Sequence, residues 1–498
     1  MNKIRRMLAA LTGICLSASM LTGLCSTVNA VQWTEQFDIN GDGEFDIIDI
    51  IRMTKYLHNG SDEWDWDFRY DLADVDKDGE IDVFDLSRLS WELVTPDDTE
   101  EIVVDYTAKN LSADFEGETV AQIRPENLDK DMLLGQTKFA LDLLRNTVEK
   151  EENAGTNVLV SPWSVSQALG MTANGAAGDT RSEMESVLGG SMETLNPSFY
   201  TFRTTAPDNK DAKLSIANSI WMREGFPVRD SFLQTNADFY GADAFRAPFD
   251  ATTVKDVNDW VNQKTDKMIP NILNKIEDRD KMILVNAVAF DAKWAFPYEE
   301  YEVSDGTFTA ADGTKQDAKM MHEEMHSYLK DDHAVGFMKR YKSHYAFAAL
   351  LPEEGMTPEE YLAGLTPERL QKTLSEPVQY SGGVNTRLPQ FEYAFDDVIN
   401  DQLQTMGMNH AFGHDADFSG ITDDPDGLFI GSVLHKTYIN VTPAGTRAAA
   451  VTAVMLAGEA MPVEPPIDIT LDRPFVYAII DTNNNLPVFI GTVNSIES

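Results

Sequence analysis

The sequence is poor in cysteine and in basic residues. Both of its cysteines, Cys15 and Cys25, lie in the first 30 of 498 residues. Lysine and arginine together number 40 against 82 acidic residues, which gives a formal net charge of −42. This excess of acid argues against nucleic-acid binding through a basic surface. The hydrophobic content of 43% is that of a globular protein, and the length predicts more than one folded unit.

The amino-terminal segment has the pattern of a secretory signal. Three basic residues precede an uncharged apolar stretch at 7–24, and small residues at 28–30 offer a cleavage site before Val31. Glycine, serine and threonine dilute the stretch and no charge cluster follows it, so we expect a signal at 1–30, a secreted protein and no membrane span. Leu24 before Cys25 argues against a lipoprotein signal. The mature chain would then have no disulfide and no cysteine metal site.

Beyond the signal, three segments differ in pattern. Residues 33–94 contain two acidic loops, each followed by an apolar helix-like run. Residues 95–127 are acidic and have little periodicity, which predicts a linker. Residues 128–498 mix long helical patterns with β-branched strands, which predicts one large domain.

The two acidic loops are repeats of one another. DINGDGEFDIID at 38–49 and DVDKDGEIDVFD at 74–85 align at a spacing of 36 residues. Oxygen-bearing side chains stand at positions 1, 3, 5, 9 and 12 of each loop, and glycine stands at position 6. A twelve-residue calcium loop has this arrangement, with the backbone carbonyl of position 7 as a further ligand. The predicted ligands for two Ca²⁺ ions are Asp38, Asn40, Asp42, Glu44, Asp46 and Asp49, and Asp74, Asp76, Asp78, Glu80, Asp82 and Asp85.

The repeat resembles a dockerin, the small all-α calcium module that binds a cohesin on a scaffoldin. Position 12 is aspartate in both loops, and each loop precedes one helix, at 49–57 and 85–94, without an entering helix. The resemblance implies attachment to an extracellular cellulosome. It also implies cohesin contacts at loop positions 10 and 11, although apolar residues there fit the module's own core equally well. These residues are Ile47, Ile48, Val83 and Phe84.

The large domain reads as an α+β fold. Apolar periodicity predicts a helix at 131–150. No nucleophile elbow, zinc helix or phosphate loop occurs, so we do not expect an enzyme. Strands are predicted at 157–160, 282–290, 429–433, 437–442, 475–480 and 488–493.

This domain resembles the serpins, inhibitors of serine proteases. NVLVSPWSVSQALGMTANGAAGDT at 157–180 and ILVNAVAFDAKWAFPY at 283–298 match two segments of the family, and with six further motifs they occur in the family order. The resemblance implies large mixed sheets, about eight to nine helices and an exposed reactive-centre loop. It also implies a monomeric domain whose shutter and breach residues are Asn157, Ser161, Ser164, Asn286, Trp294 and His435.

Serpins trap a protease by inserting the cleaved loop into a sheet as a new strand. In the segment from Gly445 to Pro466, alternate residues from Thr446 onward are small, β-branched or apolar, as one buried strand face requires. Pro443, Ala444 and Arg447 stand where serpins usually carry other residues, glutamate before the glycine and after the threonine. The predicted hinge residues are Gly445, Thr446, Ala448, Ala449, Ala450 and Thr452.

The usual loop length in serpins places the scissile bond at Glu459–Ala460. A shift by one residue gives Ala460–Met461 as the second choice. We therefore expect a suicide inhibitor that forms a covalent complex with a target serine protease and binds a cohesin through its dockerin. A non-inhibitory serpin-fold binding module and a substrate-like decoy remain as alternatives.

Overall fold

A computed structural model of the chain describes residues 73, 106–118, 120–277, 280–424, 427–446 and 464–496. The chain divides into two compact units, Met1–Val104 and Asp105–Ser498. All of the predicted calcium ligands and cohesin-binding residues lie outside the described residues. Apart from Ala73, every described residue belongs to the second unit.

The first sheet carries the site considered below. Its strands follow the order β1-β5-β4-β6-β14-β13-β12, and β3 pairs with β4. Long strands β4 and β6 are antiparallel, whereas β6 and β13 are parallel. The strands are β1 (Lys109–Asn110), β3 (Asp208–Asn209), β4 (Ala212–Arg223), β5 (Asp243–Ala247), β6 (Met282–Lys293), β12 (Phe391–Val398), β13 (Ile430–Val441) and β14 (Gly445–Thr446).

A second sheet has the order β15-β11-β8-β9-β10-β16-β17-β2, with β7 paired to β8. Central strands β10, β16 and β17 are buried along their whole length, and their sequences are correspondingly continuous in apolar residues. The strands are β2 (Val158–Val160), β7 (Val303–Thr309), β8 (Lys315–Lys330), β9 (Ala334–Arg340), β10 (Tyr345–Pro352), β11 (Val378–Pro389), β15 (Ile467–Thr470), β16 (Phe475–Asp481) and β17 (Leu486–Val493).

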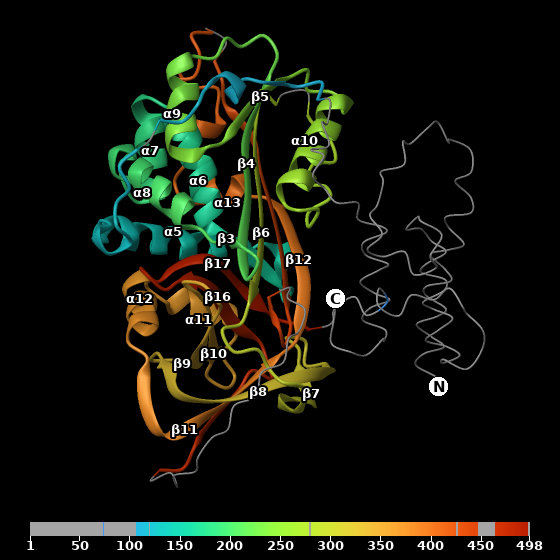
Figure 1. Cartoon of the computed structure of the whole chain (residues 1–498). Helices are drawn as coiled ribbons and strands as arrows, with labels where there is room; N and C mark the ends of the chain where they lie inside the picture. Colours follow the sequence, from blue (N-terminus) through green and yellow to red (C-terminus); the bar gives the residue numbers. More distant parts are fainter. Residues whose placement is uncertain are drawn as a thin grey trace, which may run out of the picture. The chain divides into compact units, whose positions relative to one another are not determined.

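Helices cover both faces of the first sheet (Figure 1). Helix α6 contacts β4, β6 and β17, so it lies between the two sheets, and α10 contacts β4 on the opposite face. The described helices are α5 (Lys130–Val148), α6 (Pro162–Ala173), α7 (Gly178–Leu188), α8 (Met192–Thr205), α9 (Asp230–Tyr240), α10 (Ala251–Lys264), α11 (Pro358–Gly364), α12 (Pro367–Ser375) and α13 (Asn400–Thr405). None of these helices is both long enough and apolar enough to span a membrane.

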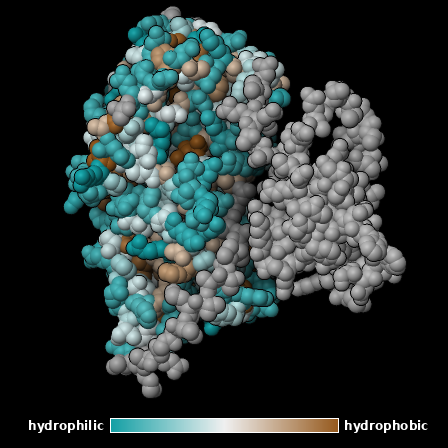
Figure 2. Space-filling model, in the orientation of Figure 1, coloured by the Kyte–Doolittle hydropathy of each residue, from teal (hydrophilic) through white to brown (hydrophobic). Residues whose placement is uncertain are grey.

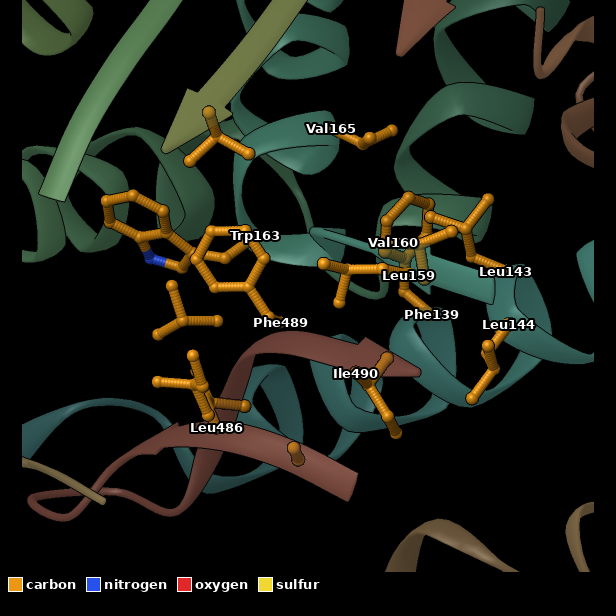
Figure 3. Packing of buried hydrophobic residues seen from close by; sticks show 14 of the residues in the cluster. Phe139, Leu143, Leu144, Leu159, Val160, Trp163, Val165, Leu486, Phe489 and Ile490 are labelled. Atoms are coloured by element: carbon orange, nitrogen blue, oxygen red, sulfur yellow. The ribbon is translucent and has the colours of Figure 1, made fainter. Parts of the chain in front are cut away.

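Helix α6 is the centre of the main core. Ser161 caps its first turn by accepting a hydrogen bond from the Ser164 N–H, and Pro162 occupies the first helical position. All twelve residues of the helix are buried, and four of them are polar, namely Ser164, Ser166, Gln167 and Thr172. Trp163 of α6 faces Phe489 of β17 in Figure 3. By contrast, the face of the molecule shown in Figure 2 is mostly hydrophilic, and its hydrophobic residues form small separate patches.

In the large domain, the structure forms a strand or helix at each segment that periodicity predicted, whereas the helices predicted at 49–57 and 85–94 lie outside the described residues. It differs at 429–442, where the two predicted strands are one continuous strand, β13. The predicted interruption contained His435 and Lys436, which lack the apolar character of a buried strand. His435 is nevertheless buried and hydrogen-bonded on both ring nitrogens, so the ladder to β6 continues through it.

The second unit begins earlier than the predicted domain boundary at residue 128. Residues 106–118 and 120–127, which the sequence pattern assigned to a linker, pack on this unit. Strand β1 pairs with the edge strand β5, and the Ala108 N–H donates to the buried Asp256 carboxylate at 2.7 Å. Two paired residues are too few to produce a visible alternation in the sequence, and their partner strand lies more than 130 residues away.

Candidate functional site

Strands β6 and β13 form the central seam of the first sheet. They pair in parallel from Met282 with Ile430 to Ala289 with Tyr438, and Asn286 lies opposite His435. At one end of the seam the short strand β14 lies between them. Gly445 there pairs with Lys293, and Thr446 pairs with Ala292 of β6 and Val441 of β13. The chain that leaves β13 thus turns back and enters the gap between the two strands.

The entrance is tight at Gly445. A Cβ atom at this position would lie 2.2 Å from the carbonyl oxygen of Ala292, so the close approach of the two backbones requires glycine. Thr446 is fully buried, and its hydroxyl meets the Tyr341 hydroxyl at 2.7 Å. The first two residues of the predicted hinge are therefore already in the sheet.

Two aromatic side chains pack beside the entrance at β14. Trp294 and Tyr341 stack with ring centroids 4.4 Å apart. The Trp294 ring N–H donates to the Thr442 carbonyl at 2.9 Å, and its backbone N–H donates to the Ala444 carbonyl at 3.1 Å. Trp294, predicted as the breach residue, thus holds both ends of the turn between β13 and β14.

Sequence reasoning missed a buried cation beside these rings. Lys339 is 4% exposed, and its ammonium lies 4.0 Å from the Tyr298 ring centroid and 5.6 Å from that of Trp294. It donates to Glu323 at 2.5 Å. Burial lowers the pKa of Lys339, and the Glu323 carboxylate opposes that shift. A single lysine in a strand carries no sequence signal of such a contact.

A buried polar network crosses the seam near its middle. The Asn286 side-chain amide donates to Ser164 and, at 2.6 Å, to the Asn218 carbonyl oxygen. Its side-chain carbonyl oxygen accepts from Nδ1 of His435 at 2.5 Å, so a side-chain hydrogen bond joins β6 to β13 in addition to their backbone pairing. All four of these residues are at least 92% buried, and together they link α6, β4, β6 and β13.

The partners of His435 define its tautomer. The backbone N–H of Ser161 donates to His435 Nε2 at 3.0 Å, so Nε2 carries no proton and Nδ1–H is the donor to Asn286. Burial lowers the pKa of His435 to about 3. A second proton, on Nε2, would point at the Ser161 N–H and break that hydrogen bond. His435 is therefore neutral at physiological pH.

The structure brings together four of the six predicted shutter and breach residues, namely Ser161, Ser164, Asn286 and His435. Asn157 lies apart from them, where it fixes the end of the chain by accepting from the N–H groups of Asn494 and Ser495. Asn218 completes the network but was not predicted. It is one of several polar residues in strand β4, and only the fold shows that its side chain faces Asn286.

The remaining loop residues that the sequence singled out lie outside the described residues. These are Ala448, Ala449, Ala450, Thr452, Glu459, Ala460 and Met461. The described chain resumes at Glu464, and the Tyr380 hydroxyl donates to the Pro465 carbonyl at 2.9 Å before β15 joins the edge of β11.

Comparison with known proteins matches this architecture. The family profile "Serpin (serine protease inhibitor)" matches residues 134–496. The chain belongs to the serpin family. Its structure is similar to that of the thermophilic serpin tengpin in the native state, with a TM-score of 0.73, 41% identity and coverage of 78% of this chain and 99% of tengpin.

Two other serpins that the chain resembles are named for different functions, one for inhibition and one for ligand binding. The leukocyte elastase inhibitor of Sus scrofa is 29% identical over 72% of this chain and 98% of its own length. Human thyroxine-binding globulin, in complex with thyroxine, is 25% identical with a TM-score of 0.66, over 74% of this chain and 99% of its own. Serpins are mostly protease inhibitors, and membership alone does not assign a mechanism.

A second profile, the dockerin type I domain, matches residues 36–94. Dockerins of this type bind calcium and pair with cohesins, and they place their carriers in extracellular cellulosomes. This serpin therefore carries a module for attachment to a scaffold.

Proposed function

We propose that this serpin is a secreted suicide inhibitor of serine proteases, held on a cellulosome by its dockerin. The observation that carries the proposal is the position of β14, which enters one end of the β6–β13 seam while the rest of the seam remains paired. An inhibitor that works by strand insertion needs a seam that is closed before cleavage and can accept a new strand, and β14 provides a start for that strand.

The register of β14 predicts how far insertion would extend. Thr446 lies opposite Ala292, so each following residue would lie opposite one residue earlier in β6. By this count Leu456 would lie opposite Met282, where β6 begins. The proposed scissile bond, Glu459–Ala460, would then follow the end of the strand closely, and a protease bound to Glu459 would be carried to the far end of the seam.

The same register supports the alternation of the loop. Thr446 faces the core, so the even-numbered residues that follow would do so as well. Thr452 would lie between Asn286 and His435, which it would separate, and its hydroxyl can bond both. Arg447 would lie opposite Asp291 on the other face, where its charge finds an acidic partner. The replacement of the family's glutamate by Arg447 is therefore compatible with insertion.

Insertion would exchange one ladder for two. The parallel β6–β13 pairing would be lost, and the new strand would pair antiparallel with both neighbours. More backbone hydrogen bonds would form than break, and antiparallel pairing is slightly more stable per residue. The intact loop is held at both ends, so cutting it would free its amino-terminal part to follow this driving force along the seam.

Trapping is tested by incubating the full mature chain with glutamyl, elastase-like, subtilisin-like and trypsin-like proteases. The protease serine would attack the Glu459 carbonyl, and the amine of Ala460 would leave. We expect a complex that survives denaturing gels and a released peptide that starts at Ala460. A peptide that starts at Met461 would move the bond to Ala460–Met461.

Clean cleavage with full recovery of protease activity would contradict the inhibitor and identify a substrate-like decoy. A loop that no protease cuts would favour a non-inhibitory binding module. Secretion through residues 1–30 and the binding of two Ca²⁺ ions belong to the same proposal and rest on sequence patterns. Of the predicted linker at 95–127, the proposal keeps residues 95–104, which precede the second unit.

A further inference from the structure

A cavity of about 320 Å³ lies between α6, α8, the end of α9 and β4, outside the seam. Figure 1 shows these elements side by side in the upper part of the domain. The volume is within the usual range for small-molecule sites. Its apolar wall is formed by Met171, Leu214, Ile216 and Ala242.

One wall carries a buried hydrogen-bond donor without an acceptor. Gln167 is 3% exposed, and its side-chain Nε2 has no hydrogen-bond partner among the described residues. Buried polar groups are nearly always hydrogen-bonded, so an orphan amide in a cavity wall indicates a position for an acceptor atom.

The same cavity contains a cation without a carboxylate partner among the described residues. Arg203 of α8 is partly buried; its Nε donates to the Phe239 carbonyl at 3.4 Å and its guanidinium lies over the Tyr200 ring. Burial lowers the pKa of Arg203, which remains charged. The other two cations of the lining, Lys213 and Lys264, each have an aspartate partner.

Acidic residues scarcely oppose this charge. Asp208 is the one acidic residue of the lining, and it is exposed. A guanidinium binds a planar carboxylate through two parallel hydrogen bonds, and the Gln167 amide can add another. The single Arg203 cation fits a ligand with one negative charge, and the apolar wall fits a ligand whose remaining part is hydrocarbon.

We propose that this cavity binds a small organic monocarboxylate with an apolar body. Arg203 would hold the carboxylate, Gln167 would donate to it, and Met171, Leu214 and Ile216 would contact the hydrocarbon. This site is separate from the β6–β13 seam, so the inference does not depend on protease trapping.

The test is isothermal titration of the full chain with cinnamate, 4-phenylbutanoate and octanoate, each beside its uncharged amide. We expect saturable binding of at least one carboxylate, with its amide bound about tenfold or more weakly because the charge is lost. The variant Arg203→Gln should lose binding to a similar extent, and Gln167→Leu should weaken it. Arg229→Gln is the matched control, because this arginine is also partly exposed but precedes the opposite end of α9.

Three results would overturn the proposal: no saturable binding of any of the carboxylates, equal binding of a carboxylate and its amide, or unchanged affinity in a folded Arg203→Gln protein. Thermal melting of each variant establishes folding separately. Because Arg203 is partly exposed and makes no ion pair with the described residues, its replacement should leave the fold intact.

Discussion

At the residue scale, His435 is the group whose protonation state matters most to the seam. Both ring nitrogens are occupied in the neutral form, one by the Ser161 N–H and one by Asn286. Its pKa of about 3 is far below the ordinary value near 6.5. Between about pH 3 and pH 6.5, His435 is therefore protonated in the unfolded chain but not in the folded chain.

This difference predicts acid sensitivity. The contribution of His435 to stability is complete above about pH 6.5 and is lost as the pH falls toward 3. At about pH 5 the free energy of unfolding should be lower by about 2 kcal/mol than at about pH 7.5 from this group alone. Chemical unfolding of the parent chain and of the His435→Gln variant at both pH values measures this difference in the free energy of unfolding. A variant with the same pH dependence as the parent would contradict the assignment.

At the element scale, the proposed inserted strand has two distinct faces. Replacing Ala450 by Glu would place a carboxylate on the face that Thr446 directs into the core, whereas Ala449→Glu would place it on the outer face. Burial of an unpaired carboxylate is strongly unfavourable. We therefore expect Ala450→Glu to be cleaved as a substrate with most of the protease released, and Ala449→Glu to retain most of the stable complex on gels. Equal loss in both variants would refute the register.

Sequence patterns predicted the elements of this fold better than the contacts of its site. Apolar periodicity located α5, β6 and β17 because each buries a continuous or regularly spaced set of side chains. The resemblance to serpins identified Asn286 and His435. It did not identify Gln167, whose Nε2 has no partner among the described residues, nor Asn218 and Lys339, since the partner of each lies 16 or more residues away in the sequence. Strand β1 escaped prediction for the same reason.

At the scale of the whole molecule, calcium should control attachment but not inhibition. The two units are separately compact, and the described residues of the serpin unit include no group of three or more acidic residues, histidines or cysteines that could hold a metal ion. Chelation of calcium should abolish binding to a cohesin and leave the yield of covalent protease complex unchanged.

The double variant Asp38→Ala and Asp74→Ala should reproduce the effect of the chelator on cohesin binding, because each change removes the first ligand of a calcium loop. Asp97→Ala and Asp98→Ala, outside both loops, serve as the matched control. Pull-down with a cohesin and a gel assay for the covalent complex measure the two activities in parallel. Loss of trapping on chelation would show that the serpin unit itself depends on calcium.

The pairing of β1 with β5 has a mechanical consequence. Insertion between β6 and β13 would move β6, β4, β5 and β1 away from β13 as one group, and the chain toward the dockerin continues from β1. Tension on the scaffold would therefore act on the half of the sheet that has to move. It would reach that half through the hydrogen bonds of Tyr106 and Ala108 to α10 and through the two residues of β1 paired at the edge. The trapping rate of an anchored molecule would then depend on the load and its direction, whereas that of a free molecule would not.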